Sequence, residues 1–314
     1  MSVAEMVATP VAGKVAEITL GGNGRKAVTL GGASALPFLR LEGAPGNRPV
    51  VAVEISDVEP TEWPEPLRAA WGDALTSPAE WAKAAVAKGA EIIALSLDSA
   101  HPDRGNASPA ACVETVKSVL AAVDVPLIVY GPGVAEKDND VLVAVADATA
   151  GMGLALGLCE DKNYRTIVAA CLASGHAAIA SSPIDLNLAK QLNILISDMG
   201  LATDRILIDP TTGALGYGIE YTYSVMERLR LAALQGDKWC AMPMVCRVGF
   251  ETWRQKEARA AAGVPAEWGD FSRRGVLWEA TTAQALLQAG ADVLVLRHPA
   301  AVALVRDAIA KLTA

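Results

Sequence analysis

Short apolar runs alternate with longer segments of helical period from residue 50 to the end of the chain, and this rhythm constrains the fold more than any other feature. The runs read as apolar on both faces, which is typical of strands in a parallel sheet covered by helices. Eight strands are predicted, at residues 50–55, 91–97, 126–130, 153–158, 177–180, 205–208, 241–246 and 292–296. Because parallel neighbours need a crossover connection, we expect a helix after each strand.

Helices are predicted between these strands and after the last one, at residues 78–88, 109–122, 138–149, 162–174, 185–199, 219–234, 272–289 and 299–312. Ser77, Ser108 and Asp185 stand where N-cap residues are expected. Eight strand–helix units predict an α/β fold of the TIM (β/α)8 barrel type. An open doubly wound sheet is the competing architecture, but no Gly-x-Gly-x-x-Gly motif follows the first strand.

The segment before the first barrel strand contains two alternating apolar and polar runs within residues 15–32, joined by Gly-Gly-Asn-Gly. This pattern is a strong β-hairpin signal. We expect the hairpin to cap the bottom of the barrel, where the strands begin. The chain is therefore divided into an N-terminal hairpin and arm, residues 1–48, packed on a TIM barrel, residues 49–314, and the two together are expected to form a single compact domain.

Charge and cysteine content exclude several classes of function. The chain has 27 Lys and Arg against 35 Asp and Glu, a net charge of −8, and no basic run suited to nucleic acid. No segment approaches the roughly 20 apolar residues of a membrane span, and the N-terminus lacks a signal-peptide pattern, so we expect a cytoplasmic protein without a membrane partner. The five cysteines are not clustered, which predicts no iron–sulfur cluster on this chain, and the three scattered histidines predict no zinc site.

The residues that follow each strand are the candidate functional residues, because active sites of (β/α)8 barrels lie at the C-terminal ends of the strands. They are Ser56, Asp57, Asp98, Gly131, Gly133, Glu160, Asp161, Ser181, Ser182, Asp209, Thr211, Thr212, Arg247, Gly249, Arg297 and His298. No lysine ends a strand, which argues against a Schiff-base aldolase, and no nucleophile has an evident orienting base. This set predicts a chain with no catalytic residues of its own.

Four residues of this rim offer oxygen and imidazole ligands for a divalent metal: Asp57, Asp98, Asp209 and His298. The interpretation we favour is that the carboxylates cap helices and pair with Arg247 or Arg297. His298, which precedes a proline, is expected at the start of the last helix. We therefore predict no metal site.

A polar, glycine-rich stretch follows the predicted strand 205–208 and begins at Asp209. Its glycines permit close approach of the backbone to a ligand. Its threonine and tyrosine hydroxyls donate or accept hydrogen bonds, but none is an acid or base at neutral pH. The stretch is suited to contacting a ligand.

Six of the seven tryptophans lie in two excursions, one after the first strand and one after the seventh: Trp63, Trp71, Trp81, Trp253, Trp268 and Trp278. The first, seventh and eighth strands are neighbours in a closed barrel, so both excursions overhang one sector of the mouth. Trp81 and Trp278 stand at helical positions and fit packing within the chain. Because tryptophan is a favoured interface anchor, we predict a partner interface formed by Trp63, Trp71, Trp253 and Trp268.

Long stretches of the sequence resemble a known family. They are GGASALPFLRLEGAPGNRPVVAVEISD from residue 31, SSPIDLNLAKQLNILI from 181, DPTTGALGYGIEYTYSVMERLRLAALQGDK from 209 and GFETWRQKEA from 249. Over essentially its whole length, the chain is similar to the small subunit of the corrinoid iron–sulfur protein. The same family appears as the delta subunit of the acetyl-CoA decarbonylase/synthase complex.

The resemblance implies a TIM-barrel subunit paired with a large subunit that carries a [4Fe-4S] cluster and a mobile corrinoid domain. The heterodimer would accept a methyl group from methyltetrahydrofolate, or its methanopterin analogue, through a methyltetrahydrofolate:corrinoid methyltransferase. It would deliver the methyl group to acetyl-CoA synthase of the CO dehydrogenase system, in the reductive acetyl-CoA (Wood–Ljungdahl) pathway of anaerobic carbon fixation. The absence of an Asp-x-His-x-x-Gly run in this chain agrees with a corrinoid held by the partner.

The small subunit is then expected to act as a scaffold and as one wall of the corrinoid (cobalamin) site, without turnover of its own. The residues predicted to contact the corrinoid are Asp209, Thr211, Thr212, Gly213, Gly216, Tyr217, Gly218, Glu220, Asn187 and His298.

Two enzymes are the alternatives. A stand-alone pterin-binding TIM-barrel methyltransferase shares this architecture, and Asp98, Asn187 and Asp209 are residue types that hydrogen-bond a pterin ring. A metal-assisted lyase built on the rim carboxylates is the other. Methylation of free cobalamin by the purified chain would identify the first, and a stoichiometric metal would identify the second.

Overall fold

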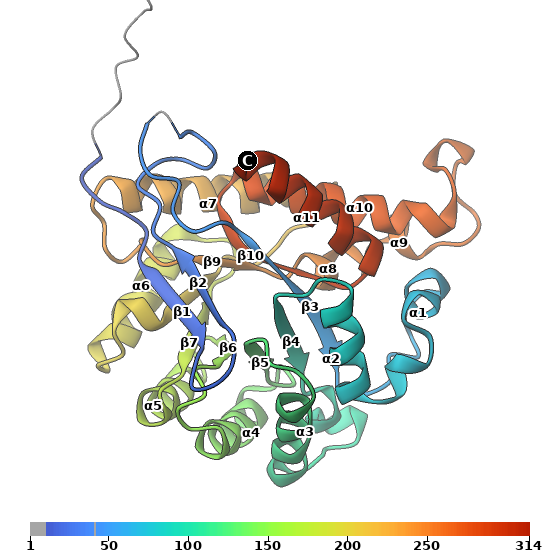
Figure 1. Ribbon diagram of the computed structural model, residues 1–314, viewed down its shortest axis with the longest axis horizontal. Coiled ribbons are helices and arrows are strands. Elements are labelled where there is room, and N and C mark those ends of the chain that lie inside the picture. The colour runs from blue at the N-terminus through green and yellow to red at the C-terminus, as the bar shows by residue number, and fades with distance from the viewer. Residues whose placement is uncertain (1–10, 41) are drawn as a thin grey trace, which may run out of the picture.

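The chain folds into a closed barrel of eight parallel strands surrounded by helices, in a computed structural model that describes residues 11–40 and 42–314 (Figure 1). In chain order the strands are β3 (Val50–Ser56), β4 (Ile92–Ser96), β5 (Leu127–Tyr130), β6 (Ala155–Cys159), β7 (Ala177–Ser181), β8 (Ile206–Asp209), β9 (Met244–Cys246) and β10 (Ala291–Leu296). Strand β10 pairs with β3 and closes the barrel. The predicted TIM (β/α)8 barrel is confirmed. Residues 1–10 and 41 of the predicted N-terminal arm lie outside the described part.

The long helices lie where the sequence predicts them: α2 (Pro78–Ala87), α3 (Pro109–Ala122), α4 (Ala135–Ala148), α5 (Tyr164–Ser174), α6 (Leu186–Asp198), α7 (Ile219–Leu234), α10 (Phe271–Gln288) and α11 (Pro299–Thr313). The predicted N-caps are confirmed, since the side chains of Ser77, Ser108 and Asp185 accept backbone N–H groups of the first helical turns. None of the helices in the described chain is both long and apolar enough to cross a membrane.

Most elements differ from their predicted bounds by at most two residues, α4 and β9 each differ by three at one end, and the excursions contain three further α-helices. Helix α4 begins at Ala135, a few residues before the predicted start. Strand β9 is shorter than predicted, because Pro243 before it has no N–H to donate to a ladder. The short helices α1 (Glu65–Trp71), α8 (Val248–Thr252) and α9 (Lys256–Arg259) lie in the two tryptophan-bearing excursions, which Figure 1 shows on the same side of the barrel.

The predicted hairpin is present as β1 (Glu17–Gly21) and β2 (Ala27–Gly31), which pair antiparallel. Its turn contains Asn23 and Gly24, both with positive φ (53° and 88°), as the Asn-Gly pair of a tight hairpin turn requires. Burial alternates along β1, so one face of the hairpin is apolar and covered while the other is exposed.

The hairpin closes the end of the barrel at which the strands begin (Figure 1). Ile18, Leu20 and Leu30 are essentially inaccessible and belong to the same apolar cluster as the side chains inside the barrel. Backbone hydrogen bonds attach the hairpin to the loops that precede β5, β6 and β9: Lys26 to Asp124, Gly21 to Gly153 and Ala16 to Ala241. The barrel interior is therefore covered from this side by residues near the start of the chain.

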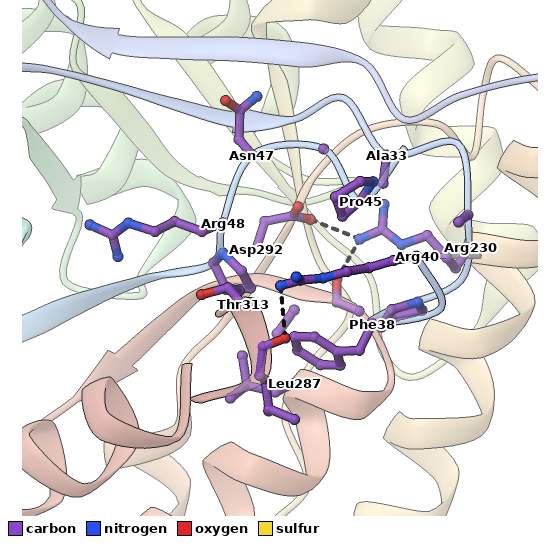
Figure 2. A pocket seen from close by; sticks show the side chains of 17 residues that line it. Ala33, Phe38, Arg40, Pro45, Asn47, Arg48, Arg230, Leu287, Asp292 and Thr313 are labelled. Atoms are coloured by element: carbon purple, nitrogen blue, oxygen red, sulfur yellow. Dashed lines mark hydrogen bonds and ion pairs between the residues drawn. The ribbon is translucent and has the colours of Figure 1, made fainter. Parts of the chain in front are cut away.

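The described part of the arm between β2 and β3 covers the same end of the barrel beside α11. It lines a cavity of about 380 Å³ together with Arg230 and Asp292 (Figure 2). These two side chains form a buried ion pair of 2.9 Å, which joins α7 to the start of β10. Arg40 donates to the backbone carbonyl of Ala314, so the arm also holds the end of the chain.

We predict that Leu30→Ala lowers the free energy of unfolding by about 2–4 kcal/mol, because it deletes a fully buried side chain and leaves a cavity. Thr19→Ala, on the exposed face of the same hairpin, is the matched control and should change stability by less than about 0.5 kcal/mol. Urea denaturation followed by circular dichroism measures both. Equal effects of the two substitutions would show that the hairpin does not share the barrel's core.

Candidate functional site

A layer of polar side chains fills the interior of the barrel at the C-terminal ends of the strands. Inward-facing positions alternate along a strand, so the apolar interior residues Val50 and Ala52 of β3 are followed by Glu54. The corresponding positions on other strands carry Ser96, Tyr130, Ser181, Asp209, Arg247 and Arg297. Most of these side chains are buried, although their polar ends lie next to the mouth of the barrel.

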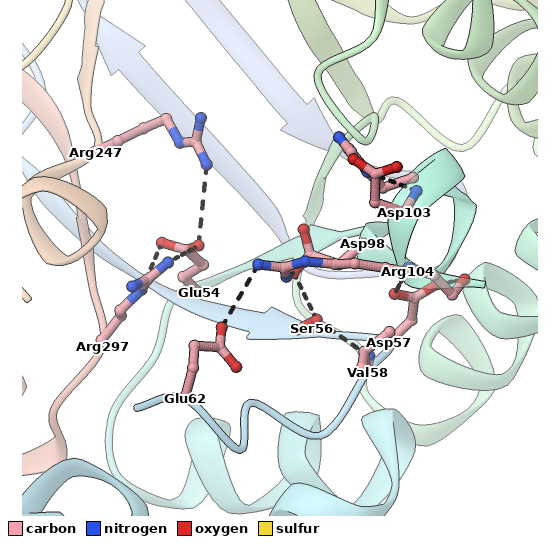
Figure 3. Close-up of polar contacts among 12 residues, drawn as sticks. Glu54, Ser56, Asp57, Val58, Glu62, Asp98, Asp103, Arg104, Arg247 and Arg297 are labelled. Atoms are coloured by element: carbon pink, nitrogen blue, oxygen red, sulfur yellow. Dashed lines mark hydrogen bonds and ion pairs between the residues drawn. The ribbon is translucent and has the colours of Figure 1, made fainter. Parts of the chain in front are cut away.

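Glu54 and Arg297 form a bidentate ion pair in this layer (Figure 3). Nε and Nη2 of Arg297 donate to the two carboxylate oxygens at 3.1 and 2.7 Å. Burial alone would raise the pKa of Glu54, but the charges of Arg297 and Arg247 outweigh burial and lower it. Glu54 is therefore ionised, and Arg297 is held in one position.

Arg247 approaches the same carboxylate from another direction but stays 3.9 Å away (Figure 3). Its guanidinium carbon lies 4.4 Å from the ring centre of Tyr130 and 4.3 Å from that of Phe250. Its Nε is buried and finds no hydrogen-bond partner among the described residues, and the same is true of the hydroxyl groups of Ser96 and Tyr130. This side of the mouth therefore holds hydrogen-bonding groups that the described chain does not satisfy.

Glu279 of α10 fixes the residues at the end of β10. Its carboxylate accepts the backbone N–H groups of Arg297 and His298 and the indole N–H of Trp253. Burial raises the pKa of Glu279 to about 7, against the effect of these three donors. The Trp253 ring in turn stacks on His298, with 5.8 Å between ring centres.

His298 begins the last helix, as the sequence predicts. Its Nδ1 accepts the backbone N–H of Ala300 at 3.0 Å, so the ring acts as the N-cap of α11. Burial lowers the pKa of His298 to about 4, and the ring is neutral at physiological pH. The predicted corrinoid contact of His298 would have to use a side chain that is only 8% exposed.

The loop after β8, residues 209–218, is held by internal hydrogen bonds. Asp209 accepts the N–H of Thr211, and the Thr211 hydroxyl donates to the carbonyl of Ser182. The Thr222 hydroxyl accepts the N–H of Gly213 and donates to the carbonyl of Thr211. A Cβ at Gly213 would lie 2.5 Å from the backbone of the same loop, so glycine is required for this close approach. These contacts hold the loop in a defined conformation.

The outer part of the same loop and its neighbours expose polar and aromatic groups. Tyr217 is 47% exposed and donates from its hydroxyl to Glu257 of α9 at 3.1 Å. Tyr221 is 65% exposed, and Glu220 beside it is also exposed. Asn187, in the first turn of α6, is exposed beyond β7. The predicted corrinoid-contacting residues thus divide into a buried set that shapes the loop and an exposed set that faces outward.

A groove of about 620 Å³ lies beside this loop, between the ends of β6, β7 and β8 and the face of α6. It is lined by Glu160, Asp161, Lys162, Ser181, Ser182, Pro183, Leu188, Gln191, Leu192, Leu195 and Thr211. Within residues 11–40 and 42–314, the buried hydroxyl of Ser182 has no hydrogen-bond partner, and neither has that of Thr212 in the adjacent loop. The groove combines apolar surface with unpaired polar groups.

The tryptophans predicted to meet a partner lie in two different environments. Trp71 and Trp253 are 6% and 3% exposed, and the indole N–H of Trp71 donates to the carbonyl of Arg297. Trp63 and Trp268 keep part of their rings exposed. Trp71 and Trp253 pack within the chain, and the predicted partner contact stays a prediction for the partly exposed Trp63 and Trp268.

The carboxylates weighed as metal ligands have partners of their own. Asp57 accepts the N–H of Ser99, and Asp98 accepts the hydroxyl of Ser56, each at 2.8 Å. The predicted pairing of these carboxylates with Arg247 or Arg297 is wrong for Asp98, which lies 3.7 Å from Arg104 instead. The carboxylate that pairs with both arginines is Glu54, which the prediction did not include. Within residues 11–40 and 42–314, no group of three or more His, Cys, Asp or Glu side chains is arranged to hold a metal ion.

Glu54, Ser96 and Tyr130 are residues of the mouth that the sequence pattern does not predict. The pattern makes each of them part of an apolar strand, yet each continues the inward-facing series of its strand toward the C-terminal end. The signal for Glu54 was available, since a single acidic residue interrupts the run Val-Val-Ala-Val-Glu-Ile. A charged side chain is rarely buried without a partner, so Glu54 at this position indicates a buried ion pair.

Solved structures of the same fold include dihydropteroate synthases. The Coxiella burnetii enzyme, in complex with pteroic acid, is 13% identical with a TM-score of 0.58, covering 95% of this chain and 98% of that one. The Xanthomonas albilineans enzyme, with 4-aminobenzoic acid, is 16% identical with a TM-score of 0.56, covering 85% and 92%. The protein is therefore a (β/α)8 barrel of the architecture found in dihydropteroate synthases.

The sequence comparison defines the family within this fold. The model of the CO dehydrogenase/acetyl-CoA synthase delta subunit family matches residues 17–307, and the chain belongs to that family. The acetyl-CoA decarbonylase/synthase complex subunit delta of Methanopyrus kandleri is 37% identical, over 95% of this chain and 75% of the relative. The subunit of the same name from Archaeoglobus fulgidus is 33% identical, over 94% and 68%. The predicted resemblance is confirmed.

Asp209 provides a test of the mouth's electrostatics. Burial raises the pKa of Asp209 to about 6, although the charge of Arg247 opposes the shift. Because the folded state binds this proton more tightly than the unfolded state, stability falls as pH rises from about 4 to about 6 and then stays reduced. Asp209→Asn removes the charge and keeps the oxygen that accepts from Thr211.

We predict that Asp209→Asn raises the free energy of unfolding at pH 8 by on the order of 2–3 kcal/mol and that the gain shrinks toward pH 4. Urea denaturation at several pH values measures this difference. Asp147→Asn, on the exposed face of α4, is the matched control and should show no such trend. A gain that is the same at pH 4 and pH 8 would contradict the prediction.

Proposed function

We propose that the chain is the small, delta-type subunit of a heterodimeric corrinoid iron–sulfur methyl carrier of the reductive acetyl-CoA pathway. Its barrel mouth would wall the corrinoid site, while a large subunit with a [4Fe-4S] cluster holds the cofactor. The observation that carries the proposal is the groove beside the 209–218 loop, in a chain of the delta-subunit family. The further partners would be the methyltetrahydrofolate:corrinoid methyltransferase and acetyl-CoA synthase.

The residues of the groove fit the edge of a corrinoid macrocycle, whose amide side chains both donate and accept hydrogen bonds. The buried hydroxyls of Ser182 and Thr212 have no partner in the described chain, and Gln191 offers an amide. Leu188 is 46% exposed and supplies apolar surface for the macrocycle face. When bound, the corrinoid supplies the cobalt that carries the methyl group.

The chain itself would shield the site and keep it in shape. The hydrogen bonds of Thr211, Gly213 and Thr222 hold the loop before any partner arrives. A preformed surface loses little conformational entropy on binding. It also excludes water from a reactive centre when the partner closes over it.

A docking surface for the large subunit adjoins this wall. Arg259 of α9 donates to the backbone carbonyl of Glu62, which links the two tryptophan-bearing excursions. The hydroxyl of Tyr217 in the 209–218 loop donates a hydrogen bond to Glu257 of the same helix α9. The partly exposed Trp63 and Trp268 therefore lie on a surface that is continuous with the proposed corrinoid wall. A large subunit bound to this surface would also reach the wall.

The stand-alone pterin-binding methyltransferase remains the alternative. Its three candidate residues are spread around the mouth: Asp98 follows β4, Asn187 lies beyond β7 and Asp209 is the last residue of β8. Strands β4 and β7 are three places apart in the barrel, and Asn187 is exposed. Binding of methyltetrahydrofolate by the isolated chain, with methylation of free cobalamin, would replace the proposed role by this one.

Co-expression with a cluster-bearing large subunit tests the proposal. We expect the purified chain to be colourless and the co-purified pair to be a brown-red heterodimer of equal stoichiometry. Trp268→Ala should weaken the pair at least tenfold, because a partly exposed tryptophan is a typical anchor, while the melting temperature stays nearly constant. Trp63→Ala should also weaken the pair, with some loss of stability, because this ring packs on Trp81 at 5.5 Å.

Trp81→Phe is the matched control, since Trp81 is fully buried. It should lower the melting temperature and leave the affinity of the folded chain for its partner unchanged. Visible corrinoid absorbance in the isolated chain would overturn the proposed division of roles. A loss of stability without a loss of affinity in Trp268→Ala would assign that ring to the chain's own packing.

A further inference from the structure

A second cavity opens at the mouth on the side of β3, β4, β9 and β10. Its volume is about 340 Å³, and it lies on different strands from the groove beside the 209–218 loop. Its floor contains Glu54, Ser96, Arg247 and Arg297 of the inward polar layer. Its walls contain aromatic rings, those of Trp63, Phe250 and Trp253. The proposed corrinoid wall leaves this cavity without a role.

The floor of the cavity holds donors without acceptors. Two N–H groups of Arg297 donate to Glu54, whereas Arg247 makes no hydrogen bond to the described part of the chain and lies 3.9 Å from a carboxylate oxygen of Glu54. The Ser96 hydroxyl faces Glu54 and helps to lower the pKa of that carboxyl, but within the described chain it makes no hydrogen bond of normal geometry. The hydroxyl of Tyr130, a residue outside the cavity lining whose ring contacts the Arg247 guanidinium, is also without a partner there. Because leaving a buried donor unsatisfied is costly, these groups indicate a missing acceptor.

We propose that this cavity binds a small carboxylic acid with a flat apolar body. The carboxylate would lie against the Arg247 guanidinium, whose planar fork matches two oxygens, and would accept from the hydroxyl groups of Ser96 and Tyr130. The apolar body would lie against the rings of Phe250 and Trp63. The cavity volume is at the small end of the range for ligand pockets.

The charges around the cavity agree with an anionic ligand. Its lining contains five arginines and four carboxylates, although the whole chain carries a net charge of −8. Glu54 is already neutralised by Arg297, so it does not repel a second carboxylate as an unpaired charge would. Arg254, in the same lining, pairs with Glu251 at 3.2 Å and is 57% exposed, which leaves Arg247 as the buried cation available to the ligand.

Benzoate and its uncharged analogue benzamide, titrated into the full-length isolated chain, test the proposal. We expect benzoate to bind with a dissociation constant on the order of millimolar and benzamide at least tenfold more weakly. Arg247→Lys keeps the charge and loses the fork, and it should weaken benzoate about tenfold. Ser96→Ala and Tyr130→Phe should each weaken it about two- to tenfold. Saturation-transfer NMR and calorimetry measure these affinities.

Arg254→Ala is the matched control and should bind benzoate as the wild type does. The comparison of benzoate with benzamide uses only the wild-type chain, so it stands even if a variant misfolds. Equal binding of the two compounds, or full affinity in Arg247→Lys, would overturn the proposal. The proposal would also be overturned if benzoate did not bind at a concentration about tenfold above the expected dissociation constant. Water or an acidic side chain of a partner would then be the acceptor for these donors. No outcome depends on a corrinoid or a large subunit.

Discussion

The C-terminal end of the barrel depends on the three hydrogen bonds that the buried carboxylate of Glu279 accepts. They reach the backbone at the end of β10, the first residue of the α11 cap and the indole of Trp253 in the following excursion. With its backbone fixed there, Arg297 meets Glu54 across the β10–β3 junction, where the barrel closes. A single acceptor on an outer helix thus positions the inner polar layer, the last helix and one side of the mouth.

The mouth has two sides with different chemistry. On one side, ion pairs and aromatic rings surround a smaller cavity that contains donors without an acceptor in the described chain. On the other side, a hydrogen-bonded loop borders a wider and more apolar groove. The proposed corrinoid wall would use the broad groove, and the proposed small-acid site would use the cavity on the other side. Trp63 would border both the cavity and the proposed docking surface for the large subunit.

Most of the fold could be predicted from local sequence signals, and most of the mouth could not. Apolar runs and N-caps identify strands and helices because they act over a few residues, and Asn-Gly does the same for the hairpin. Which residues share the interior layer depends on register around a closed barrel, so Ser96 and Tyr130 looked like ordinary strand residues. The burial of Trp71 and Trp253 depends on how the excursions fold back, which no short pattern specifies.

The hairpin that closes the bottom of the barrel has a consequence for the order in which the protein is assembled. Its apolar face belongs to one apolar cluster with side chains of all eight barrel strands, including Val293 and Val295 of the last strand. During synthesis the hairpin emerges before all eight barrel strands, and β10 emerges after the other seven. These contacts span almost the whole chain, so they form late, after slow non-local closure. Until then the nascent chain carries an uncovered apolar strand pair, the kind of surface that chaperones bind.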